Sequence, residues 1–74
     1  MIITSYLVSG MTCGHCVSAV TEEIGRLDGV TVVEVDLVPG GESRVTVTST
    51  AKLPVDAVAA AVEEAGYDLA GASQ

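Results

Sequence analysis

The sequence predicts an α+β fold, with two helices on one face of a four-stranded antiparallel sheet, from three observations. Several short segments alternate apolar and polar residues, as half-buried strands do. Two longer segments repeat apolar residues every three or four positions, which is the pattern of amphipathic helices. Glycines and prolines separate these segments in the order β-α-β-β-α-β. This order is typical of the split β-α-β sandwich.

The first half of the chain predicts a strand, a helix and a second strand. Residues 2–8 are rich in β-forming side chains and end at Ser9-Gly10. Residues 16–27 carry an apolar stripe at helical spacing, and Gly29 suits the left-handed position after a helix end. Residues 30–38 alternate apolar with acidic side chains. The apolar positions of these two segments are Val17, Val20, Ile24, Leu27, Val33, Val35 and Leu37.

The middle of the chain predicts a hairpin and then a second helix. Pro39-Gly40-Gly41 forms the turn, and residues 44–48 return as a strand with Val45 and Val47 on one face. Pro54 suits the first turn of a helix that runs to about residue 65. The apolar face of this helix is expected to contain Val55, Val58, Val62 and Ala65.

The end of the chain predicts a short last strand. Gly66 ends the second helix, residues 67–70 form the strand, and residues 71–74 are expected to fray. A chain of this length has room for one thin core, so residues 1–74 are predicted to be a single domain. The split β-α-β arrangement places the last strand antiparallel to the first.

Composition limits the functions that this chain can have. The net charge of −7 repels phosphate and anionic lipid, which argues against nucleic acid or membrane surfaces as partners. The negative charge favours cations or a basic protein surface as binding partners, or it only keeps the protein soluble. The sequence contains neither a signal peptide nor an apolar run long enough to cross a membrane, so we expect a cytoplasmic protein. A domain this small has no room for a large cleft, and we expect a binding protein and not an enzyme.

Both cysteines lie in the segment Met11-Thr12-Cys13-Gly14-His15-Cys16, at a predicted strand-to-helix turn. Two thiols at this spacing can hold one soft metal ion or close a redox disulfide. Cu(I) accepts two thiolates, and Ag(I), Hg(II) and Cd(II) are also soft, whereas structural Zn(II) usually takes four ligands. The N-terminus of the helix predicted over residues 16–27 carries the positive end of the helix dipole, which favours the thiolate form of Cys16. We therefore predict a soft-metal site at Cys13 and Cys16.

A thiol–disulfide oxidoreductase is the alternative from a different class. Proteins of that kind also place Cys-x-x-Cys at a strand-to-helix junction. They usually carry a cis-proline strand that faces the disulfide and a tryptophan before the motif. In this chain Pro39 and Pro54 lie in predicted connections, and there is no tryptophan. Metal binding is therefore the preferred interpretation.

Three other residues are candidates for a supporting role at this site. Met11 is predicted to anchor the loop in the core, in preference to acting as a ligand. His15 is predicted to be a solvated loop residue, with metal ligation or a bridging role in a dimer as alternatives. Tyr67 begins the strand that neighbours the first one, so it is expected near the two sulfurs, where it either packs or supports the metal site.

The segment Gly10–Cys16, with Val17 and Val20 after it, resembles the signature of the heavy-metal-associated domain family, in particular its small bacterial copper chaperones. The similarity continues through Leu27-Asp28-Gly29-Val30 and Ala65-Gly66-Tyr67-Asp68. The resemblance implies a ferredoxin-like fold and Cu(I) held by Cys13 and Cys16. It implies transfer of Cu(I) by ligand exchange to the N-terminal metal-binding domain of a copper-transporting P-type ATPase, or to a copper-responsive repressor. A copper-bridged homodimer through the same face is also expected.

Other members of the family give two further alternatives, a mercury-binding protein and the metal-binding regulatory domain of a copper ATPase. A tyrosine that matches Tyr67 lies near the metal in bacterial members. Many members carry basic residues on the first helix, where this chain has Ser18, Glu22 and Glu23. We therefore expect a partner surface that supplies its own lysines or arginines.

Overall fold

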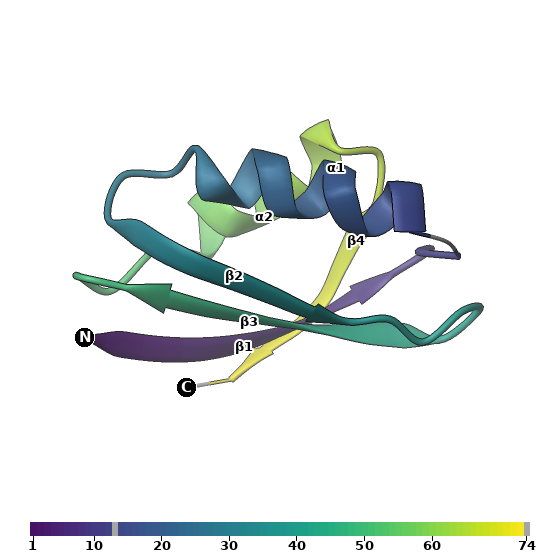
Figure 1. The fold of residues 1–74 in the computed structure, drawn as a ribbon, viewed down its shortest axis with the longest axis horizontal. Coiled ribbons are helices and arrows are strands. Elements are labelled where there is room, and N and C mark those ends of the chain that lie inside the picture. The colour runs from purple at the N-terminus through teal and green to yellow at the C-terminus, as the bar shows by residue number, and fades with distance from the viewer. Residues whose placement is uncertain (13, 74) are drawn as a thin grey trace.

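The predicted order of elements is confirmed by the computed structural model, which describes residues 1–12 and 14–73. Both helices lie on the same face of the sheet, and the opposite face is uncovered (Figure 1). The elements are β1 (Ile2–Ser9), α1 (Gly14–Gly25), β2 (Val30–Asp36), β3 (Glu42–Ser49), α2 (Val55–Glu64) and β4 (Asp68–Ser73).

The four strands form one antiparallel sheet in the order β2-β3-β1-β4. This confirms the ferredoxin-like α+β fold and the predicted position of the last strand beside the first. Ser9, at the end of β1, is opposite Glu42 of β3 on one side and Asp68 of β4 on the other. The segment that contains the cysteines therefore leaves the sheet between the starts of β3 and β4.

The expectation that residues 71–74 fray is wrong for residues 71–73, which belong to β4. They pair with Leu7, Tyr6 and Ser5 after an irregularity in register between Leu7 and Val8. Through this pairing, the backbone amide and carbonyl groups on the free edge of β1 gain hydrogen-bonding partners. The free energy of these hydrogen bonds outweighs the tendency of a terminus to fray. Position 74 lies outside the described residues.

Helix α1 begins two residues before the predicted start and also ends two residues earlier, at Gly25. The chain continues in tighter turns, with backbone hydrogen bonds from Arg26 to Glu23 and from Leu27 to Ile24. A further turn from Leu27 to Val30 contains Gly29 at φ +89°, so this glycine serves the turn before β2 and not the end of the helix. Strand β2 is shorter than the predicted second strand, and β3 is longer than the predicted third strand.

The core lies between the sheet and the helices, and valine is its commonest residue. Val55 was expected on the core face of α2 but is 52% exposed, whereas Ala61 is buried in that helix. Pro54 is the N-cap of α2 and precedes the first turn in which it was expected. The buried apolar residues are Tyr6, Val8, Met11, Cys16, Val20, Ile24, Val45, Val47, Val58, Ala61 and Val62.

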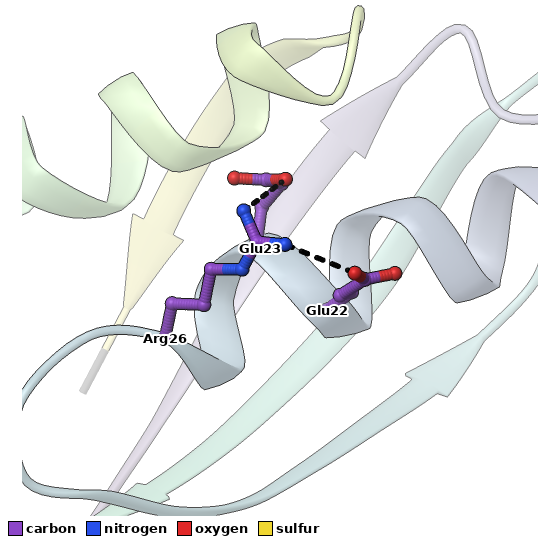
Figure 2. A network of polar contacts seen from close by, with 3 residues as sticks. All are labelled: Glu22, Glu23 and Arg26. Atoms are coloured by element: carbon purple, nitrogen blue, oxygen red, sulfur yellow. Dashed lines mark hydrogen bonds and ion pairs between the residues drawn. The ribbon is translucent and has the colours of Figure 1, made fainter.

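The solvent face of α1 carries the charged residues that the helical pattern predicted there. Arg26 forms ion pairs with Glu22 at 3.0 Å and with Glu23 at 3.2 Å (Figure 2). Pairs this exposed contribute little to stability, because water and salt screen them. Two carboxylates against one guanidinium leave this face with a net negative charge. Neither helix of the described chain is long and apolar enough to span a bilayer.

Candidate metal centre

The loop that carries the cysteine motif begins with a glycine that turns the chain out of β1. Gly10 has φ +92°, a left-handed conformation that residues with a β-carbon rarely adopt. The next residue, Met11, points into the core and is fully buried. This confirms the prediction that Met11 anchors the loop from below. Apolar burial at Met11 and the sharp turn at Gly10 together fix where the loop starts.

Cys16 is the third residue of α1 and is 7% exposed. The backbone N–H of Thr12 donates a hydrogen bond to its Sγ at 3.5 Å. The Thr12 hydroxyl lies 3.9 Å from the same sulfur, close enough for a weak hydrogen bond. Donors aimed at a sulfur favour its thiolate form, which is the form that binds metal. Thr12 therefore belongs to the site, although no spacing rule in the sequence identified it.

Cys13 directly precedes Gly14, the first residue of α1, and lies outside the described residues. Its predicted role as the second ligand is therefore carried by its place in the sequence, three residues before Cys16. Among the residues that the structure describes, no three His, Cys, Asp or Glu side chains converge on one point.

Tyr67 is positioned by the end of α2. Gly66 has φ +95°, and its N–H donates to the carbonyl of Glu63 at 2.9 Å, while the N–H of Tyr67 donates to the carbonyl of Val62 at 3.1 Å. This pair of bonds is the Schellman motif, which ends a helix and fixes the direction of the chain after it. The half-buried Tyr67 ring consequently lies against Gly10, since a β-carbon built there would be 3.5 Å from Cδ1 of the tyrosine. Tyr67 thus reaches the start of the cysteine loop.

The predicted site residues divide into two groups. Met11 and Cys16 belong to the core cluster, and Tyr67 packs against it. His15 is the second residue of α1 and is exposed, so it is solvated as expected but is helical, not part of a loop. The structure therefore places Met11 and Cys16 in one core cluster with Tyr67 packed against it, bonds Thr12 to the Cys16 sulfur, and leaves the imidazole of His15 at the surface.

Replacing Gly66 by alanine is expected to lower the free energy of unfolding by about 1–2 kcal/mol, because the left-handed conformation is strained for an L side chain. Urea denaturation followed by circular dichroism measures the change. Gly25→Ala is the matched control, because a β-carbon at this helical glycine meets nothing within 4 Å. It is expected to stabilise the protein by up to about 1 kcal/mol. Equal unfolding midpoints for the two variants would contradict the role of Gly66.

Fold and site together make this chain a small ferredoxin-like α+β domain with a buried cysteine in the first turn of its first helix. The chain matches the model of the heavy-metal-associated domain over residues 5–68, and it belongs to that family. It is 47% identical over 64 residues to the copper chaperone CopZ of Bacillus subtilis strain 168. The aligned region covers 85% of this chain and 88% of that protein.

Solved structures agree with this assignment. The fold superimposes on a CopZ metallochaperone with a TM-score of 0.79 and 38% identity, covering 92% of this chain and 98% of the other. It also superimposes on the yeast copper transporter domain Ccc2a, solved in apo and Cu(I)-loaded states, with a TM-score of 0.80 and 25% identity. That match covers 97% of this chain and 94% of the yeast domain.

Proposed function

We propose that this protein is a cytoplasmic Cu(I) chaperone, which carries one copper ion between the thiolates of Cys13 and Cys16 and is not an enzyme. The observation that carries the proposal is the Cys16 sulfur, held at the first turn of α1 by the Thr12 N–H. The likeness to proteins named copper chaperones, at 47% identity for the Bacillus subtilis relative, supports copper as the cargo. The Cu(I)-loaded state described for the yeast domain supports the same oxidation state.

Transfer of the ion proceeds by exchange of ligands. Cu(I) with two thiolates has room for a third, so a cysteine thiolate of the acceptor forms a Cu–S bond before one Cu–S bond to the donor breaks. Copper stays Cu(I) throughout, and the protons lost by the two acceptor thiols are balanced by those taken up by the two donor thiols. Cys16 is almost buried, so it is expected to release the ion last, after Cys13 has exchanged.

The proposed acceptor is the N-terminal metal-binding domain of a copper-transporting P-type ATPase or a copper-responsive repressor. Exposed carboxylates outnumber the exposed Arg44 toward the end of the molecule that carries the cysteine loop, whereas Arg26 follows α1 and Lys52 follows β3 at the other end. An acceptor with lysines or arginines around its own thiols complements this distribution. The carboxylates at the loop end are Glu42, Glu63, Glu64 and Asp68.

Affinity for such an acceptor is expected to fall as salt is added, because the Debye length shrinks from about 30 Å at 0.01 M to about 8 Å at 0.15 M ionic strength. Isothermal titration of the Cu(I)-loaded protein with the acceptor domain at several salt concentrations measures this dependence. An affinity that does not change with salt would show that the acidic residues take no part in docking. Sedimentation of the Cu(I)-loaded protein without acceptor would reveal a copper-bridged homodimer, to which the exposed His15 can contribute.

The central test is a competition titration of the reduced protein with Cu(I) against a strong bidentate chelator, followed by copper-edge X-ray absorption. One Cu(I) per chain with two short Cu–S bonds is the expected result. Weak binding, together with a Cys13–Cys16 disulfide that exchanges with substrate thiols in an insulin-reduction assay, would replace the chaperone by an oxidoreductase. Parallel titrations with Ag(I), Hg(II) and Cd(II) rank copper against the other soft ions, and a preference for Hg(II) would favour a mercury-binding protein.

A further inference from the structure

The sheet has two edge strands, and β2 is the one that a strand of another molecule could extend most readily. β2 lies at one edge and β4 at the other (Figure 1). An edge strand pairs on one side only, so its other backbone N–H and C=O groups can pair with a foreign strand. The seven residues of β2 include four valines and one threonine, which favour strand pairing, and no glycine or proline. A free edge of this composition promotes self-association.

The first half of β2 carries a β-bulge. Val30 and Val32 pair with consecutive residues of β3, so Thr31 is an extra residue on the edge strand. The Thr31 hydroxyl donates a hydrogen bond to the carbonyl of Thr48 at 3.1 Å. Thr31 and Val32 are both exposed, although the side chains of a regular strand alternate between the two faces. A bulge bends the strand and increases its twist, so this half of the edge is a poor template for a second strand.

The other edge of the sheet has the same feature. Leu69 and Gly71 of β4 pair with consecutive residues of β1, so Ala70 is the extra residue there. The two central strands, β1 and β3, pair without a break over eight residues. Both irregularities of the described sheet thus lie on its edge strands, where they hinder pairing with another molecule.

The second half of β2 is regular and carries two carboxylates. The residues from Val33 to Asp36 pair with four consecutive residues of β3. Val33 and Val35 pack against the core, whereas Glu34 and Asp36 alternate with them and are exposed on the uncovered face of the sheet. Acidic residues are disfavoured in strands, and within the described chain neither carboxylate forms a hydrogen bond or an ion pair. The fold alone therefore gives these two charges no role.

These charges act on a second strand that approaches the edge. In two copies whose β2 strands pair parallel and in register, each carboxylate would lie about 5 Å from its counterpart. Like charges directly opposite each other on paired strands are destabilising. Arg44 of β3 is opposite Asp36 and partly offsets its charge. Glu34 is opposite the neutral Thr46, so it contributes the larger share of the repulsion.

We propose that the bulge at Thr31 and the carboxylates of Glu34 and Asp36 together keep the edge of β2 from pairing with a second copy of this chain. The bulge interrupts the half of the strand that carries no charge, and the carboxylates occupy the half that has no bulge. The bulge also lets Val30 and Val33 both pack against the core, so it has a second role. The carboxylates have no such role, and the test is therefore made on them.

The test compares the self-association of three double variants with that of the parent, all metal-free and reduced. Glu34→Gln with Asp36→Asn removes both charges from the edge and keeps the size of the side chains. Glu63→Gln with Glu64→Gln is the matched control, because it changes the net charge equally at exposed residues of a helix. Glu34→Lys with Asp36→Lys places like charges of the opposite sign on the edge. Thioflavin fluorescence and sedimentation velocity measure assembly.

Glu34→Gln with Asp36→Asn is expected to speed assembly by about tenfold or more, and the control to change it by less than about twofold. The lysine variant is expected to stay as monomeric as the parent, because like charges on two copies repel whatever their sign. Equal assembly by the edge variant and the control would overturn the proposal. Assembly of the lysine variant as fast as that of the neutral variant would also overturn it, because loss of stability would then be the cause. All these measurements are made without copper, so neither result bears on the proposed function.

Discussion

Replacement of Cys16 by serine is expected to weaken Cu(I) binding by more than about 100-fold, beyond the 10–100-fold loss that supporting residues of a metal site typically cause. The hydroxyl of serine is a hard, protonated donor with little affinity for Cu(I). The fold is expected to survive, because the serine hydroxyl can still accept the Thr12 N–H at the start of α1. Competition titration against a chelator measures the affinity, and circular dichroism measures the fold.

Two further variants sharpen this test. Cys13→Ser is expected to cause a loss of similar size, because either substitution leaves one thiolate. Thr12→Val keeps both sulfurs and the backbone N–H on Cys16, and removes only the hydroxyl 3.9 Å from Sγ. Its expected loss is less than about tenfold, since a single weak hydrogen bond is removed. Tight Cu(I) binding by Cys13→Ser or Cys16→Ser would show that the two-thiolate site is wrong.

Replacement of Ile24 by alanine is expected to lower the free energy of unfolding by about 2–5 kcal/mol, because a fully buried side chain is lost and a cavity remains. Domains of this size have a total stability of only about 4–11 kcal/mol. The melting temperature is therefore expected to fall by at least about 10 °C. Thermal unfolding of the metal-free protein, followed by circular dichroism, measures the change.

Ile3→Ala makes the same chemical change at a residue that is 63% exposed on the uncovered face of the sheet. Its expected cost is less than about 1 kcal/mol, because little apolar surface returns to water. Losses of equal size in the two variants would contradict the assignment of the core to the space between helices and sheet.

The arrangement of elements could be predicted because hydrophobic periodicity and glycine positions agree along most of the chain. The details that failed depend on contacts distant in sequence. The last three described residues form strand because a free edge of β1 is available to them, which no local pattern records. Val55 has the spacing of a core residue, but it stands at the first position of α2 and is exposed.

Less of the candidate site could be derived in this way. The core position of Met11 and the approach of Tyr67 to the start of the cysteine loop followed from motif and topology, while the two-thiolate site stays a prediction. The hydrogen bonds from Thr12 to Cys16 depend on the exact path of the loop after Gly10, which the residue types do not specify. The full burial of Ser43 is likewise visible only in the fold, where its hydroxyl accepts the N–H of Val38, because serine alone suggests a solvated position.

The pairing of β4 with β1 also decides where the two ends of the chain emerge. Ser73 is opposite Ser5, in the middle of β1, whereas the cysteine loop follows Ser9 at the end of the same strand. Described residues near the two ends therefore lie away from the cysteine loop, Ile2 by about a full strand and Ser73 by about half a strand (Figure 1). A fusion partner, an affinity tag or a surface linker can be attached at either end without covering the loop. For the same reason, copies of this domain fused end to end in one polypeptide would each keep their cysteine loop uncovered.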